Sequence, residues 1–340
     1  MTINGCNDRV ESSVVDLPRD IKLFDVFDDY DRFAFPEAVY RVTGGHGGEA
    51  ILICGSEKTA LLDCGMAYCA QITVQNVLNR LAALGRQRLD YILLSHSHYD
   101  HIGALPWMRE SFPGAVVCGS EHCAHILKRP GAHALMKELG EDALQLYEPG
   151  STKEIRVDGL GVDRVLRDGD VISLGEQRVT AFETPGHTDC SMSFFLQPQG
   201  LLFTSESTGI IEGKVGGTPD GRGYIHTPVL KDFHQALQSM EKCRALHPAA
   251  VCLPHFGMVP PGMLDRYWDD FAEECESKIA FARLLKDGGL SDEEMLDRYA
   301  ARYWTTYKAM EQPKEAFLIN SKHILRALMK EIDRRDNSGI

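Results

Sequence analysis

Short apolar runs with the length of β-strands recur along the first three quarters of the chain, separated by polar segments. The runs at 50–54 and 59–63 flank the polar segment 55–58, and this arrangement predicts a β-hairpin. Residues 69–85 instead place apolar side chains at helical spacing and end at Gly85, which predicts a helix. Alternating elements of this kind predict an α/β domain with two halves. Further runs that have the pattern of strands occupy 91–94, 178–182, 201–206 and 251–255.

From about residue 262 the pattern changes to that of amphipathic helices. Ser291 and Glu294 have the spacing of a capping box, which predicts that a helix begins there. Because such a tail is too short and too amphipathic to stand alone, we expect a C-terminal helical extension, 262–340, that packs on a domain formed by 20–261. The predicted helices of the extension occupy 264–287, 292–310 and 315–334.

The extension carries a group of aromatic residues whose role the sequence leaves open: Tyr299, Tyr303, Trp304 and Tyr307. On one interpretation they form a lid over an apolar acyl or aryl substrate, with hydroxyl groups available for orientation. On the other they only pack the extension against the domain, as aromatic residues often do. Dimer contact is a third role for the tail, so a homodimer is among the expected assemblies.

Directly after the apolar run 91–94, three histidines and an aspartate form the pattern H-x-H-x-D-H within six residues. A strand keeps positions i and i+2 on one face, so His96 and His98 are predicted to converge on one metal ion. Asp100 and His101 are expected on the turn that leaves the strand, facing the same cleft. Imidazole and carboxylate groups are good ligands for zinc and other first-row metals.

Three later candidate ligands also stand at or just after the end of an apolar run. His187 follows the run 178–182, the run 201–206 ends in Glu206, and the run 251–255 ends in His255. Each run is predicted to be a strand that delivers one ligand at its C-terminal end. Any of the three alone is a weak signal, but their order behind the first motif makes a metal site with ligands from several strands the best interpretation.

With these motifs in this order, the chain resembles the metallo-β-lactamase superfamily of metal-dependent hydrolases over roughly residues 30–260. The resemblance implies the α/β fold of that family, a four-layer αββα sandwich, here followed by the C-terminal helical extension. It also implies two divalent metal ions, with zinc expected and iron or manganese as alternatives. The implied ligands are His96, His98 and His187 for the first metal, Asp100, His101 and His255 for the second, Glu206 as the bridge, and Asp63 as a buried support.

Two positions depart from the family pattern. The bridging residue is usually aspartate, whereas this chain has Glu206, which is one methylene longer. The longer side chain either bridges both metals or binds one of them. Phe256 stands where a glycine commonly follows the last histidine, and it either lines the pocket or fills core.

The resemblance further implies a hydrolase in which a bridging hydroxide cleaves an ester, thioester or lactone of a small molecule. Asp100 would orient the nucleophile and take its proton. The spacing of the tail helices is similar to that of bacterial quinolone-signal thioesterases. Two alternatives stay open: a phosphodiesterase of small molecules, and a metal-containing regulatory or binding protein with little turnover.

The composition of the chain limits the kinds of partner that we expect for it. The 340 residues carry a formal net charge of −13 and no basic run, which argues against a nucleic-acid partner. No run of about 18 apolar residues is present, so no membrane span is expected. The ten cysteines include no C-x-x-C pair, and several lie inside apolar runs, as reduced buried thiols do. Without a visible signal peptide, the chain is expected to be cytoplasmic and to act on a small-molecule substrate.

A glycine cluster at 44–48, Gly-Gly-His-Gly-Gly, is the remaining motif. It lacks the strand–loop–helix setting and the Lys-Ser/Thr pair of a phosphate-binding loop. We therefore expect a flexible turn there.

Overall fold

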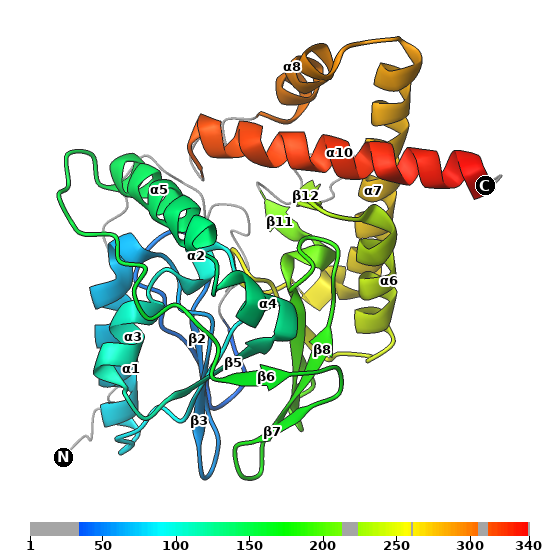
Figure 1. The fold of residues 1–340 in the computed structure, drawn as a ribbon. Helices are drawn as coiled ribbons and strands as arrows, with labels where there is room; N and C mark the ends of the chain where they lie inside the picture. The colour runs from blue at the N-terminus through cyan, green and yellow to red at the C-terminus, as the bar shows by residue number, and fades with distance from the viewer. Residues whose placement is uncertain (1–33, 213–223, 260, 305–311, 339–340) are drawn as a thin grey trace, which may run out of the picture.

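Two β-sheets form the centre of the computed structural model, which describes residues 34–212, 224–259, 261–304 and 312–338 (Figure 1). The first sheet has six strands in chain order, in which the pairs β1–β2 and β2–β3 are antiparallel and the pairs β3–β4, β4–β5 and β5–β6 are parallel. Its strands are β1 (Val39–Arg41), β2 (Ile51–Cys54), β3 (Thr59–Leu62), β4 (Tyr91–Leu93), β5 (Val116–Ser120) and β6 (Arg164–Leu166).

The second sheet has five strands in the order β13-β10-β9-β8-β7. All neighbours are antiparallel except β10 and β13, which run parallel. Its strands are β7 (Val171–Ser173), β8 (Arg178–Glu183), β9 (Met192–Gln197), β10 (Leu201–Phe203) and β13 (Ala250–Cys252). A separate two-stranded sheet pairs β11 (Ile210–Glu212) with β12 (Tyr224–His226).

Helices cover the outer faces of both sheets. Helices α1 and α3 share a core with the outer face of the first sheet, and α6 and α7 share another with the outer face of the second. A third core lies between the sheets. The four-layer αββα sandwich is therefore confirmed. The larger helices are α1 (Ala70–Ala83), α3 (Leu105–Ser111), α5 (Pro130–Tyr147), α6 (Phe233–Arg244), α7 (Leu264–Asp287), α8 (Asp292–Tyr303) and α10 (Lys314–Ser338).

The continuous apolar character of the central strands follows from this layering. In β2, Leu52 belongs to the core under the helices, while Ile51 and Ile53 belong to the core between the sheets. A strand that is buried on both faces needs apolar residues at consecutive positions, because neighbouring side chains point to opposite faces. The predicted hairpin 50–63 is confirmed as the antiparallel pair β2–β3.

The C-terminal helices extend the core of the second sheet. Residues of α7, α8 and α10 join those of α6 and β10 in one cluster of buried side chains. The capping box at the start of α8 is confirmed, with both hydrogen bonds between Ser291 and Glu294 present. Figure 1 shows α7 beside α6, with α10 crossing it near the C-terminus. Across the described ranges, no helix is both long and apolar enough to span a membrane.

The lid interpretation of the tail aromatics is wrong for two of the four. Tyr299 and Tyr303 are buried in the shared core, and their rings contact each other at a centroid distance of 4.5 Å. Trp304 packs against Phe317 of α10, and Tyr307 lies outside the described residues. The packing of α7, α8 and α10 against one another uses these rings, because three amphipathic helices need large apolar side chains between them.

Every cysteine of the described residues is free and buried, which agrees with the expected reduced thiols: Cys54, Cys64, Cys69, Cys118, Cys123, Cys190, Cys243, Cys252 and Cys275.

Candidate metal centre

The H-x-H-x-D-H motif lies in a loop and a short helix, and this corrects the strand argument made for it. Strand β4 ends at Leu93, so His96 and His98 both lie in the following loop. Their rings nevertheless approach each other edge to face, with centroids 4.6 Å apart. Helix α2 (Tyr99–Ile102) begins directly after His98 and carries the other two residues of the motif, Asp100 and His101.

The three later residues lie a few positions beyond the C-terminal ends of strands, in loops or turns and not on the strands themselves. His187 follows β8, and His255 follows β13. Glu206 begins the short 3-10 helix η3 (Glu206–Thr208), three residues after β10 ends. Ser205 caps this helix by accepting a hydrogen bond from the backbone N–H of Ser207, which fixes the direction in which Glu206 leaves the backbone.

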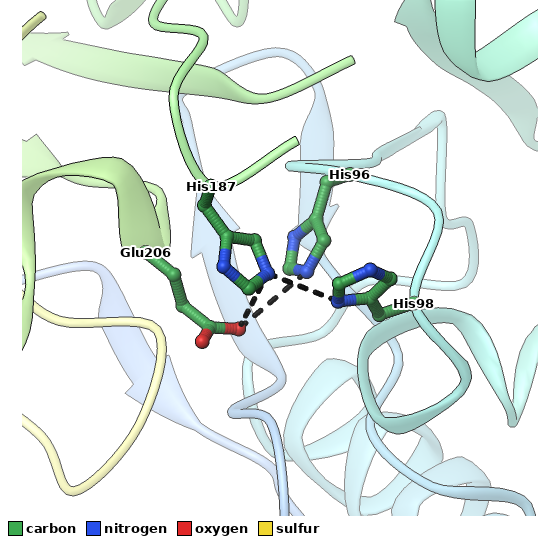
Figure 2. A group of neighbouring side chains, drawn as sticks. All are labelled: His96, His98, His187 and Glu206. Carbon is green, nitrogen blue, oxygen red and sulfur yellow. Dashed lines mark hydrogen bonds and ion pairs between the residues drawn. The ribbon is translucent and has the colours of Figure 1, made fainter. Parts of the chain in front are cut away.

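Four of these side chains form a first ligand group, drawn in Figure 2. His187 Nε2 lies 3.0 Å from His98 Nδ1. Glu206 Oε1 lies 3.5 Å from His96 Nε2 and 3.6 Å from His187 Nε2. The group combines three imidazole nitrogens with one carboxylate oxygen, a donor set suited to zinc or another first-row metal.

A second ligand group contains Asp100, His101, His255 and the same Glu206. Glu206 Oε1 lies 3.1 Å from His101 Nε2 and 3.4 Å from His255 Nε2. Asp100 Oδ2 lies 3.4 Å from each of these two nitrogens. One oxygen of Glu206 thus belongs to both groups, which brings all seven candidate ligand residues together at one site. The glutamate side chain, one methylene longer than aspartate, reaches the position between the two groups.

Buried acceptors orient two of the histidine rings. Asp63 accepts hydrogen bonds from the Ser95 backbone N–H at 2.7 Å and from Ser95 Oγ at 2.6 Å. Because the Ser95 hydroxyl donates to Asp63, it accepts from His96 Nδ1 at 3.0 Å. His101 Nδ1 donates to the same carboxylate, at 3.0 Å from Asp63 Oδ2, the oxygen that also accepts from Ser95 Oγ. Both rings therefore turn Nε2 toward the site.

A third ring is oriented in the same way by a backbone carbonyl. His187 Nδ1 donates to the carbonyl of Pro228, so Nε2 faces the other ligands. The Nε2 atom of His96 is buried and has no hydrogen-bond partner among the described residues. Buried nitrogen lone pairs that converge on a carboxylate oxygen need a cation for their stability. The residues present therefore fit a metal ion.

The electrostatics of the first group favour the metal-binding protonation states. Burial, with a further contribution from His187, lowers the pKa of His98 to about 3. Burial and the neighbouring His101 lower the pKa of His96 well below its ordinary value. Burial alone would raise the pKa of Glu206, but the histidines around it, His187 first, lower it well below its usual range. At neutral pH His96 and His98 are therefore neutral imidazoles and Glu206 is a carboxylate, the forms that bind metal.

The glycine cluster 44–48 is part of the site, which the sequence interpretation missed. A Cβ atom on Gly48 would lie 2.6 Å from the Asp100 carbonyl oxygen and 2.7 Å from His101 Nδ1. His46 stacks on Tyr147 of α5 with ring centroids 5.0 Å apart. The loop is thus closely packed beside two ligands instead of being a free turn. The available signal was the run of glycines itself, because glycine permits such close approach.

A cavity of about 350 Å³ opens onto the ligands. His98, Asp100, His187, Glu206 and His255 all lie in its wall. Phe256, which stands where the family commonly has glycine, also lines the cavity. Its backbone has φ 62°, in the left-handed region where glycine is common. The remaining wall comes largely from α5 and α10, which lie at the same end of the sandwich (Figure 1).

Comparison with known proteins agrees with this geometry. The sequence model of the metallo-beta-lactamase superfamily matches residues 43–255. A metallo-beta-lactamase fold-containing protein, ST1585 of Sulfurisphaera tokodaii, is 26% identical over 231 residues, which is 67% of this chain and 80% of that protein. The atrochrysone carboxyl ACP thioesterase of Aspergillus fumigatus is 28% identical over 220 residues, 62% of this chain and 55% of that enzyme.

A solved structure also shares the fold. The metallo-beta-lactamase family protein TTHA1429 of Thermus thermophilus covers 86% of this chain and 94% of its own, with a TM-score of 0.56 and 17% identity.

Proposed function

Since this chain belongs to the metallo-beta-lactamase superfamily and is a metal-dependent hydrolase, we propose that it uses two divalent metal ions to cleave an ester, thioester or lactone of a small molecule. The observation that carries this proposal is the position of Glu206. Its Oε1 atom lies within 3.6 Å of the Nε2 atoms of four histidines that belong to the two ligand groups. A carboxylate oxygen in that place suits a dinuclear centre.

The protein's own residues define the chemistry at this centre. When bound, two divalent ions supply hydroxide at neutral pH and polarise a carbonyl oxygen. Asp100 lies in the cavity wall beside His101 and His255, and its carboxylate is partly exposed to the cavity. We assign it the orientation of the attacking water and the acceptance of its proton. Zinc is the metal we expect for this histidine-rich site, with iron and manganese as alternatives.

The cavity wall supports a substrate with an apolar acyl or aryl group. Leu135 and Leu139 lie one turn apart on α5, and Phe317 and Ile319 belong to α10; all four line the cavity. Leu135 and Ile319 are also 48% and 40% exposed. These apolar residues line the same cavity as the candidate metal ligands, so the cavity suits a substrate with an apolar group. The Aspergillus relative, named as an ACP thioesterase, supports a thioester.

A panel of substrates tests this function directly. Thioesters with the same leaving group and acetyl, butanoyl and hexanoyl groups should be hydrolysed, with kcat/KM rising about fourfold for each methylene that enters the cavity. A lactone, a simple ester and bis(4-nitrophenyl) phosphate complete the panel. Chelation and His98→Ala should each abolish turnover. Preference for the phosphodiester would favour the alternative phosphodiesterase, and no turnover with both metals bound would favour a binding protein.

Matched variants at leucine and isoleucine positions distinguish a loss of acyl-group binding in the cavity from a general effect of placing a charge on the surface. Ile319→Asp and Leu135→Asp should lower kcat/KM for the hexanoyl thioester at least ten times more than for the acetyl thioester. Leu284→Asp is the control, because Leu284 is 71% exposed on α7 and is not part of the cavity wall that the structure describes. Equal losses on both thioesters would rule out the assigned acyl site.

A further inference from the structure

Helix α7 of the C-terminal extension contacts the segment that carries Glu206. The Tyr267 hydroxyl is fully buried and donates to the carbonyl of Thr208 at 2.7 Å, with the carbonyl of Gly209 at 3.1 Å. Thr208 is the last residue of η3, which Glu206 begins. Phe271, one turn after Tyr267, lies so close to Gly209 that a Cβ there would be 2.7 Å from its ring. The end of η3 is therefore held against α7.

The same helix contacts the segment that orients His187. Lys278 is fully buried, and its Nζ atom donates to the carbonyl of Thr227 at 3.1 Å. The next carbonyl along the chain, that of Pro228, accepts the hydrogen bond from His187 Nδ1. The ammonium group also lies 4.0 Å from Glu274 Oε1 and 5.1 Å from the centre of the Tyr303 ring. A buried charge with these neighbours fixes the Thr227 carbonyl, because a charged donor makes a strong hydrogen bond at a buried site.

The spacing of the two residues explains how one helix reaches both segments. Positions 267 and 278 are eleven residues apart, about three turns, so their side chains leave α7 on nearly the same face. They are separated by about 16 Å along the helix axis. One straight face of α7 therefore spans the distance between the η3 segment and the Thr227–Pro228 segment.

We infer that α7 is a structural part of the metal centre, in which Tyr267 and Lys278 are positioning residues for Glu206 and His187. Both ligands belong to the first group, and His187 belongs to that group alone. This inference rests on one part of the proposed function, namely that the site binds metal ions, and does not depend on which substrate is cleaved. It gives the C-terminal extension a role in metal binding that is separate from its contribution to the cavity wall.

Two conservative variants test the inference. Lys278→Met keeps the length of the side chain without the donor, and Tyr267→Phe removes only the hydroxyl. Each should weaken the binding of one of the two ions about tenfold, the lower end of the effect of residues behind metal ligands. Competition with a chromophoric chelator during zinc titration measures the two affinities. Ile279→Ala and Tyr299→Phe are the controls, since both residues are buried in the same core; they should lower the melting temperature without this selective loss.

A second measurement does not require bound metal. Hydrogen–deuterium exchange of peptides covering 185–189 and 226–230 should be at least fivefold faster in Lys278→Met than in Ile279→Ala. If the wild-type protein binds no metal, the proposed function fails, while faster exchange in these peptides still supports the positioning role. Unchanged metal affinity in a metal-binding wild-type background, or exchange equal to that of Ile279→Ala, overturns the inference.

Discussion

Asp63 and His101 are joined by a hydrogen bond of 3.0 Å between Oδ2 and Nδ1, although 38 positions separate them in the chain. Asp63 has φ 50°, in the left-handed region, and its second oxygen accepts from the Ser95 backbone. A residue held in that conformation by hydrogen bonds on both oxygens serves as a fixed support for the histidine ring. The second ligand group therefore depends on a residue that belongs to neither ligand group.

Asp63→Asn should lower the affinity for one metal ion by about 10- to 100-fold, because its amide has only one acceptor oxygen and cannot accept from the Ser95 backbone N–H and from His101 Nδ1 at their separate positions. Zinc titration against a chelator measures the change. The folded state should persist, as judged by circular dichroism. An affinity equal to that of the wild-type protein would show that His101 is oriented by other contacts.

Glu206→Gln should reduce the metal content from two ions to about one per chain, because a neutral amide oxygen is a poor bridge between two cations. Glu206→Asp keeps the charge but withdraws the carboxylate by about 1.5 Å, one carbon–carbon bond, and should give an intermediate affinity. Elemental analysis after purification without chelator gives the stoichiometry. Two tightly bound ions in Glu206→Gln would exclude the bridging role.

Gly48→Ala should disturb the second ligand group, because the added Cβ would approach His101 Nδ1 to 2.7 Å. We expect at least a tenfold loss in turnover or in affinity for one metal ion. Gly131→Ala is the matched control, since a Cβ there meets no atom within 4 Å. Gly131 lies in the first turn of α5, where alanine is tolerated. Equal behaviour of the two variants would show that the 44–48 loop moves aside freely.

Asp163→Asn should lower stability at neutral pH but not in strong acid. Burial alone would raise the pKa of Asp163, but the guanidinium of Arg109 and the N–H of Val117 lower it below its ordinary value. A depressed carboxyl pKa stabilises the fold above the unfolded pKa, near 3.8, and this stability disappears as the pH falls through the folded pKa. The partly exposed pair is worth about 0.5–1 kcal/mol.

Urea unfolding at pH 7 and pH 2.5 checks this prediction. The difference between Asp163→Asn and the wild-type protein should shrink at the lower pH. A constant difference would mean that the carboxylate charge is not what stabilises this contact.

The sequence alone predicted several of the strands and helices and pointed to the candidate ligand residues. Strands such as β2 are buried on both faces, so their apolar runs stand out from the polar turns around them. The ligands follow those runs at short intervals, as His255 follows β13, and their chemical types are fixed by what a metal accepts. Local signals of the same kind predicted the helix that begins after Ser291, because a capping box is complete within four residues.

Only the tertiary structure decided how the ligands are held. His96 and His98 converge from a loop, where the alternation of a strand does not apply, because β4 ends three residues earlier. The support of His187 by Pro228 and the contact of Lys278 with Thr227 join residues 41 and 51 positions apart. Such pairs leave no periodic or local trace in the sequence, because their distance depends on how the whole sandwich and its C-terminal helices pack.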